Sequence, residues 1–105
     1  MPTSKQSHGE PFQATNTHAT AASASKAAAT GKTHYVTDAS ASSDKAGAIL
    51  LIKDGTTTIW QVQMPANGSV ILHFVQPLTG TKGATVSVDV DGTAACKANI
   101  AGFTL

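Results

Sequence analysis

The chain has 105 residues, enough for one small domain, and Ala, Thr, Ser and Gly make up about half of it. Charged residues are only 12%, and the formal net charge is +1, with seven Lys and no Arg. A nucleic-acid-binding protein would normally carry a basic stripe with Arg available for bidentate phosphate contacts, so this class is not expected. The same balance argues against a polybasic membrane-surface protein.

Cysteine content and hydropathy narrow the possibilities further. Cys96 is the only cysteine, which excludes an internal disulfide and a multi-cysteine zinc site. No apolar run approaches the roughly 18 to 20 residues that span a bilayer. The first residues have no apolar segment after Lys5, unlike a signal peptide. We therefore expect synthesis in the cytoplasm, no export by the signal-peptide route and no membrane partner.

The apolar residues are divided sharply along the chain. Every Val, Ile and Leu follows Thr33, and Met1 and Phe12 are the only large apolar residues before it. A segment with so little apolar surface cannot offset the entropy lost when it is ordered. The sequence therefore predicts an extended, Ala/Ser/Thr-rich N-terminal arm at 1–33 and a separate domain at 34–105.

Two alternatives remain open for this arm. Residues 19–30 are rich in alanine and could form a short helix, although twelve residues are marginal for an isolated helix. The arm is either a disordered tail or a segment that orders against a partner, with Phe12 as its anchor. Its low charge favours the second alternative, because solvated tails usually carry more charge.

The segment 34–105 has the pattern of an all-β domain. Trp60, Val62 and Met64 alternate with Gln61 and Gln63, which is the period of a half-buried strand. Asp-Gly pairs at 54–55 and 91–92 are strong hairpin signals. About seven strands bounded by turns predict a small antiparallel β-sandwich or jelly-roll-like domain. The expected strands are 34–38, 48–53, 57–64, 69–76, 84–90, 93–98 and 99–105.

A domain of this size is close to the lower limit for independent stability. Small domains are usually reinforced by disulfides, metals or oligomerisation. An internal disulfide is excluded here because the chain has a single cysteine. The sequence therefore predicts a homo-oligomer, either a dimer or a trimer. The residues expected in the core or at the oligomer interface are Trp60, Val62, Met64, Leu72, Phe74, Val86 and Val88.

No motif for catalysis, metal binding or cofactor binding is present. The segment 89–92 resembles the start of a calcium loop but lacks the further acidic ligands of such a site. The four histidines lack metal-ligand spacing, and Cys96 lies in no catalytic signature. We expect no catalytic residues, no metal and no cofactor. His73 is expected to face outward or to lie at an interface, where a trimer could bring three copies together.

Four segments of the chain resemble those of small tailed-bacteriophage virion proteins of the capsid decoration or cement type. The resemblance extends from His34 onward, over about two-thirds of the chain, and consists of hairpins, not catalytic motifs. The segments are HYVTD (34–38), LIKDGTTTIW (51–60), PLTGTKG (77–83) and AGFT (101–104). The resemblance implies a β-sandwich on the outer surface of the virion, an extended arm and the major capsid protein as partner. It implies no enzymatic residue.

The leading hypothesis is therefore a non-enzymatic structural protein that stabilises contacts between major capsid protein subunits. In this hypothesis the arm at 1–33 lies along the shell or a neighbouring subunit. The alternative is a tail, baseplate or head-fibre component that acts as an adaptor or host-binding module. A third class, a small enzyme or ligand-binding module, would be favoured by a bound metal or by a pocket at His73 and Cys96.

Overall fold

The protein is built from two antiparallel β-sheets packed face to face. The computed structural model describes residues 9–45, 47–65, 67–91 and 94–105, which contain eight strands and no helix. The first sheet, sheet A, has the strand order β1-β8-β3-β6, and sheet B has the order β2-β7-β4-β5. The strands are β1 (Glu10–His18), β2 (Ser23–Lys26), β3 (His34–Ser43), β4 (Ile49–Asp54), β5 (Thr57–Gln63), β6 (Ser69–Thr79), β7 (Val86–Asp91) and β8 (Cys96–Thr104).

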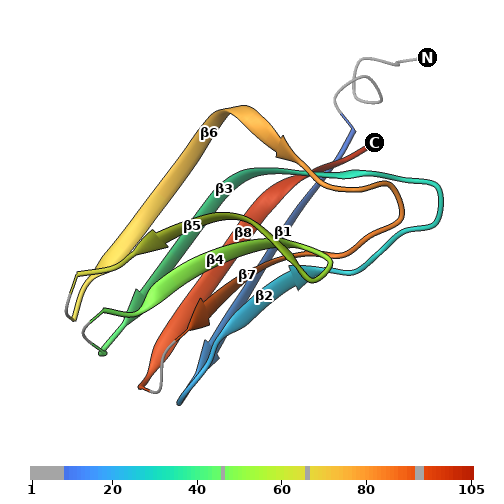
Figure 1. The fold of residues 1–105 in the computed structure, drawn as a ribbon. Coiled ribbons are helices and arrows are strands. Elements are labelled where there is room, and N and C mark those ends of the chain that lie inside the picture. Colours follow the sequence, from blue (N-terminus) through green and yellow to red (C-terminus); the bar gives the residue numbers. More distant parts are fainter. Residues whose placement is uncertain (1–8, 46, 66, 92–93) are drawn as a thin grey trace.

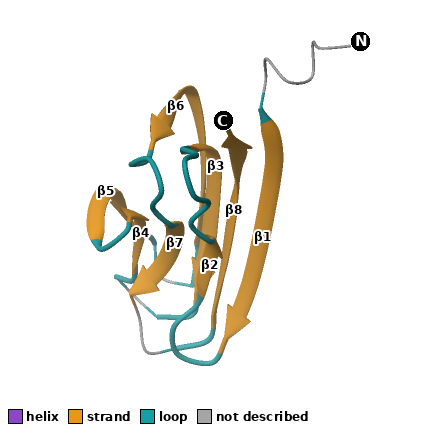
Figure 2. Ribbon diagram, turned by 90° about the vertical axis from the view of Figure 1, so that its right-hand side faces the viewer, coloured by secondary structure: helices purple, strands orange, loops and turns teal. Residues whose placement is uncertain are grey.

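The strand order is that of an eight-stranded jelly roll. Hydrogen-bonded neighbours are β1 with β8, β2 with β7, β3 with β6, and β4 with β5. This is the pairing of one long antiparallel ribbon whose tip is the β4–β5 hairpin, rolled so that successive pairs fall in opposite sheets. Figures 1 and 2 show the two sheets as two layers, which are joined by the loops between successive strands. The predicted all-β fold is confirmed.

The core between the sheets is formed largely by small side chains. Leu50, Ile52 and Ile100 are the largest apolar residues with almost no exposed surface. Alanines fill much of the remaining space, together with the valines of β7. The fully or nearly fully buried small residues are Ala22, Ala24, Val36, Ala39, Ala41, Ala48, Val86, Val88, Val90 and Ala98. Many small contacts therefore replace a few large ones in this core.

The first two strands correct the expected division of the chain at Thr33. All nine residues of β1 pair with β8, and the four residues of β2 pair with β7. Ala22 and Ala24 belong to the core, and residues 19–30 contain a strand in place of the possible helix. The reason is that an edge strand needs one partner and a few small inward side chains, which an Ala/Ser/Thr-rich segment supplies. The rest of the expected arm, residues 1–8, lies outside the described residues.

Strand boundaries differ from the prediction at two further places. The two strands expected at 93–98 and 99–105 are one strand, β8, so that the described residues of the segment 34–105 contain six strands. β6 continues through Pro77 to Thr79, in a segment expected to be a loop. Pro77 is tolerated because β6 is an edge strand, where a missing N–H need not disrupt a ladder. The hairpin turn expected at 91–92 includes Gly92, which lies outside the described residues.

A β-bulge changes the inward face of β3 halfway along the strand. His34 and Val36 are buried, then Thr37 and Asp38 follow, and burial resumes at Ala39. The register against β6 jumps from the pair Val36–Leu78 to the pair Asp38–His73. Only Thr37 of β3 therefore lies opposite residues 74–77 of β6, and β6 arches away from the sheet here (Figure 1).

The four segments that carry the phage-protein resemblance meet at one end of the sandwich. Gly80 N–H donates to the His34 carbonyl oxygen at 2.9 Å, and the Thr81 hydroxyl donates to Asp54 at 2.6 Å. The rings of Tyr35 and Phe103 stack with their centroids 4.8 Å apart. These segments therefore hold the loops and strands of one end together.

The buried side chain of His34 also stabilises this end of the sandwich. It has no exposed surface, and its Nε2–H donates to the Ala27 carbonyl oxygen at 2.8 Å. Its Nδ1 accepts from the Thr104 hydroxyl at 2.7 Å. Both ring nitrogens are thus satisfied, which is what a buried polar group requires.

Candidate functional site

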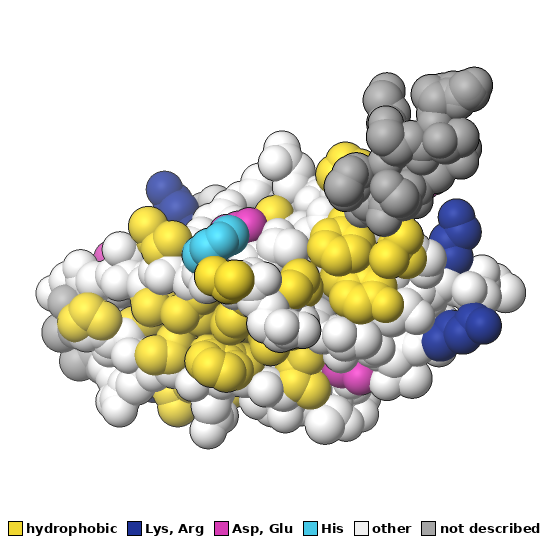
Figure 3. Space-filling model, turned by 90° about the horizontal axis from the view of Figure 1, so that it is seen from above, with side chains coloured by type: hydrophobic (Ala, Val, Ile, Leu, Met, Phe, Trp, Pro, Cys, Tyr) yellow, Lys and Arg dark blue, Asp and Glu magenta, His cyan; other side chains and the backbone are white. Residues whose placement is uncertain are grey.

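An exposed apolar surface lies where the edges of the two sheets come together. β5 pairs only with β4, and β6 pairs only with β3, so both strands are edges. Trp60 is 45% exposed, Ile71 81% and Val75 90%. Together with Phe74 they form a surface that we call the β5–β6 apolar edge. In Figure 3 hydrophobic side chains collect in the part of the molecule where these strands lie. Such patches commonly mark interaction sites.

Trp60 and Phe74 connect the two sheets at this edge. Their ring centroids are 5.3 Å apart and the rings are nearly perpendicular, at 79°. This edge-to-face arrangement is favourable for aromatic pairs. Phe74 packs against the core while Val75, the next residue in the β6 arch, points into solvent. The arch therefore presents an apolar side chain that the domain itself does not bury.

The other residues predicted for the core or oligomer interface fall into two groups. Met64, Val86 and Val88 are buried in the core. Val62 and Leu72 are partly buried and pack against it. The sequence did not distinguish these residues from Trp60, because an alternating pattern does not show where a sheet ends.

Phe12, the predicted partner-binding anchor, is used inside the domain. Its ring packs against the core and lies edge-on to His34, with centroids 5.7 Å apart. The Lys26 ammonium lies 5.9 Å from the ring centroid. Phe12 therefore ties β1 to the sandwich.

Next to the apolar edge, a histidine and a carboxylate join β6 to β3. His73 Nδ1–H donates to Asp38 Oδ1 at 2.8 Å, and the Thr37 hydroxyl donates to Asp38 Oδ2 at 2.9 Å. The hydrogen bond from His73 lowers the pKa of the Asp38 carboxyl below its ordinary value of 3.8, and desolvation opposes this shift. The bulge creates this pair, since it brings Asp38 opposite His73.

Replacing Asp38→Asn should lower stability by less than about 1 kcal/mol near neutral pH, because both partners are largely exposed. A lowered pKa means that the carboxylate stabilises the folded state above 3.8. That stabilisation is lost as the pH falls through the lowered value. Urea unfolding of both proteins across this range should show curves that converge in acid. A difference that persists in strong acid would contradict this origin.

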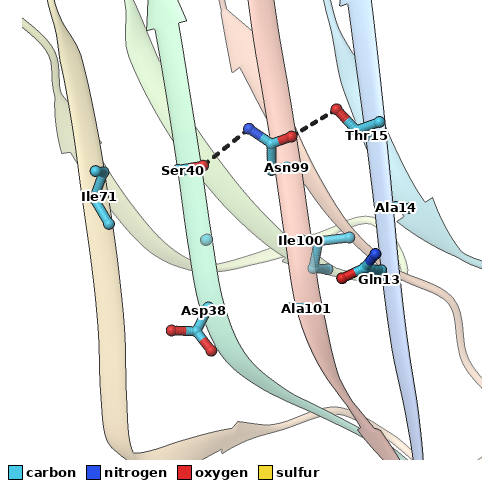
Figure 4. A pocket seen from close by; sticks show the side chains of 10 residues that line it. Gln13, Ala14, Thr15, Asp38, Ser40, Ile71, Asn99, Ile100 and Ala101 are labelled. Carbon is cyan, nitrogen blue, oxygen red and sulfur yellow. Dashed lines mark hydrogen bonds between the residues drawn. The ribbon is translucent and has the colours of Figure 1, made fainter.

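A groove runs across the outer face of sheet A. Its volume is about 330 Å³, and it is formed by residues of β1, β3, β6 and β8. The pairing register places Thr15, Asn99, Ser40 and Ile71 in one row across the four strands. The next row contains Gln13, Ala101, Asp38 and His73. The small side chain of Ala101 leaves the space between Gln13 and Asp38 (Figure 4).

Hydrogen bonds fix the first of these rows. The Thr15 hydroxyl donates to Asn99 Oδ1 at 2.6 Å, and Asn99 Nδ2 donates to the Ser40 hydroxyl at 2.9 Å. Figure 4 shows this line of contacts over three strands. The orientation of the Asn99 amide is thus set before any ligand arrives. The stacked rings of Tyr35 and Phe103 lie in the row beyond Ala101, toward the end of the sandwich.

The two residues singled out for a ligand or catalytic pocket, His73 and Cys96, are not brought together. They pair with Asp38 and Ser43 of β3, five residues or about 17 Å apart along the strand. Cys96 is buried, where its sulfur accepts the Ala22 N–H at 3.1 Å. Within residues 9–45, 47–65, 67–91 and 94–105, no three His, Cys, Asp or Glu side chains are grouped as for a metal ion.

The groove was not predicted from the sequence. Its polar residues are scattered over positions 13 to 99, and only the strand register aligns them. The available signal was alternation: Gln13 and Thr15 on β1, and Asn99 on β8, each occupy outward positions of their strands.

Comparison with known proteins leaves these surfaces as the basis for assigning a function. No protein-family model matches the chain, and no curated protein matches its sequence. In the part of the chain that the structure describes, no helix is long and apolar enough to cross a membrane.

Proposed function

We propose that this protein is a non-enzymatic structural component of a tailed-bacteriophage virion. It binds the outer surface of the capsid and stabilises contacts between major capsid protein subunits. The observation that carries the proposal is the β5–β6 apolar edge, with Trp60, Ile71 and Val75 exposed on the two edge strands. The resemblance of four segments to capsid decoration proteins supplies the class of partner.

The character of the edge supports association with another protein surface. An unpaired edge strand presents free N–H and C=O groups, and a neighbouring chain can pair with them. Aromatic residues such as Trp60 often contribute most of the binding energy in protein interfaces. The same edge is available to a second copy of the chain, and we propose that the protein acts as a homo-oligomer.

The low charge of the chain is compatible with dense packing on a shell. Charged residues are 12% of the sequence and the net charge is +1. Copies of a nearly neutral domain repel one another weakly at short separation. Many individually weak contacts can then give strong attachment, because a lattice engages them together.

The function is tested with a single change at the apolar edge. Val75→Lys places a charge on a side chain that is 90% exposed, so the stability of the isolated domain should change by no more than about 0.5 kcal/mol. Affinity for purified capsids should fall at least about tenfold. The temperature at which capsids rupture should return toward that of bare capsids.

Thr17→Lys is the matched control, because it adds the same charge to an exposed position of the opposite edge strand of sheet A. It should bind capsids as the unmodified protein does. Equal binding by both variants, or capsids that rupture at the same temperature with and without the protein, would refute the proposal. If the protein is found in few copies confined to the tail, the adaptor or host-binding alternative replaces it.

A further inference from the structure

The groove on the outer face of sheet A has the features of a small-molecule site, and it shares only Ile71 with the β5–β6 apolar edge. Its volume of about 330 Å³ lies at the lower end of the range found for such sites. Ala101 belongs to its lining, with Gln13 and Asp38 on either side (Figure 4). We propose that this groove binds a neutral pyranose sugar.

The polar groups of the groove match the chemistry of sugar hydroxyls. A hydroxyl group both donates and accepts hydrogen bonds, so a site that recognises several of them needs donors and acceptors side by side. The amide of Gln13 offers both, and the Asp38 carboxylate accepts. The Thr15 hydroxyl already donates to Asn99 and is left as an acceptor, whereas the Ser40 hydroxyl accepts from Asn99 and can still donate. Because β8 lies between β1 and β3, the groups on these two strands are two strand spacings, about 10 Å, apart, so a ring lying over Ala101 can present hydroxyls on its opposite sides to both strands.

The charge of the groove favours a neutral ligand over an ionic one. Asp38 is the only charged residue among those that line it, and its carboxylate already accepts hydrogen bonds from His73 and Thr37. A negatively charged ligand would meet this carboxylate without a lysine lining the groove to balance it. A cation would find no second acidic side chain in the lining.

Preorganisation of the groove reduces the cost of binding. The hydrogen bonds from Thr15 to Asn99 and from Asn99 to Ser40 hold the central side chain of the row in place. The side chains of Thr15, Asn99 and Ser40 therefore have little freedom left to lose when a ligand binds. The stacked pair of Tyr35 and Phe103 in the adjoining row offers an apolar surface for the C–H face of a ring that extends past Ala101.

The test is an NMR titration of the full chain, labelled with nitrogen-15, with methyl pyranosides. The probes are the methyl glycosides of glucose, galactose, mannose and N-acetylglucosamine, each added to about 50 mM. A site of this size should bind one of them with a dissociation constant on the order of 1 mM. Saturable shifts are expected for the side-chain amide signals of Gln13 and Asn99. Linear trisaccharides of the same sugars form a second arm, and tighter binding in it would indicate a glycan chain as the ligand.

Two variants locate the site and one provides the control. Asn99→Ala removes the central amide, and Ala101→Val fills the floor of the groove without removing a polar group. Each should raise the dissociation constant at least tenfold while dispersed amide spectra show that the fold is kept. Gln61→Ala alters an exposed glutamine on the edge strand of the other sheet and should bind as the unmodified chain does. Absence of saturable shifts with every probe, or unchanged affinity in Asn99→Ala and Ala101→Val, would overturn the proposal.

Discussion

Removal of residues 1–26 is expected to abolish cooperative folding of the domain. The deletion takes away β1 from sheet A and β2 from sheet B, so each sheet loses one of its four strands. It also removes Ala22 and Ala24 from the core, and the contacts of Phe12 with the core. β8 and β7 would become edges with newly exposed apolar residues. A domain of this size has only about 5–15 kcal/mol of stability to lose.

Thermal unfolding followed by circular dichroism should then show no sigmoidal transition for 27–105, whereas the full chain shows one. Removal of residues 1–8 is the matched control, because it shortens the same terminus and leaves all eight strands intact. That shorter deletion should keep the cooperative transition. A sharp transition for 27–105 close to that of the full chain would mean that the division near Thr33 suggested by composition is a real domain boundary.

The misassignment of β1 and β2 has a physical cause. Composition indicates how much large apolar surface a segment can bury, and residues 10–26 have little beyond Phe12. The structure stabilises this segment differently, through nine paired positions with β8 and four with β7. The inward alanines match other alanines across a core that has few large side chains. Backbone pairing with a distant strand leaves no trace in local composition.

Local signals were more reliable where the structure is also local. Asp54-Gly55 forms the β4–β5 turn, with Gly55 at a φ of +63°. The alternation of Val86, Val88 and Val90 correctly indicated an inward face in β7. The β3 bulge and the β6 arch depend instead on how two strands far apart in sequence align. The apolar edge and the groove lie beside these irregularities, so neither surface could be derived from the sequence alone.

The strongest single-residue effect is expected at Gly102, on the inward face of β8. A Cβ added there would overlap the backbone carbonyl oxygen of Tyr35 and lie 3.0 Å from the Phe12 ring. A backbone atom within a paired strand cannot rotate away as a side chain can, so β8 must shift from β3. We expect Gly102→Ala to cost about 3–5 kcal/mol, above the usual cost of overpacking. The midpoint of thermal unfolding should fall by about 15 °C or more.

Two further variants show whether the backbone contact is responsible. Gly31→Ala provides the control: Gly31 has a φ of +75° but nothing within 4 Å of an added Cβ, so only the backbone conformation is penalised, by about 1–2 kcal/mol. Combining Gly102→Ala with Phe12→Leu removes the ring and leaves the Tyr35 carbonyl in place. The double variant should remain as unstable as Gly102→Ala alone. Recovery of stability on loss of the ring would show that the side-chain contact, not the approach of the two backbones, makes glycine necessary at this position.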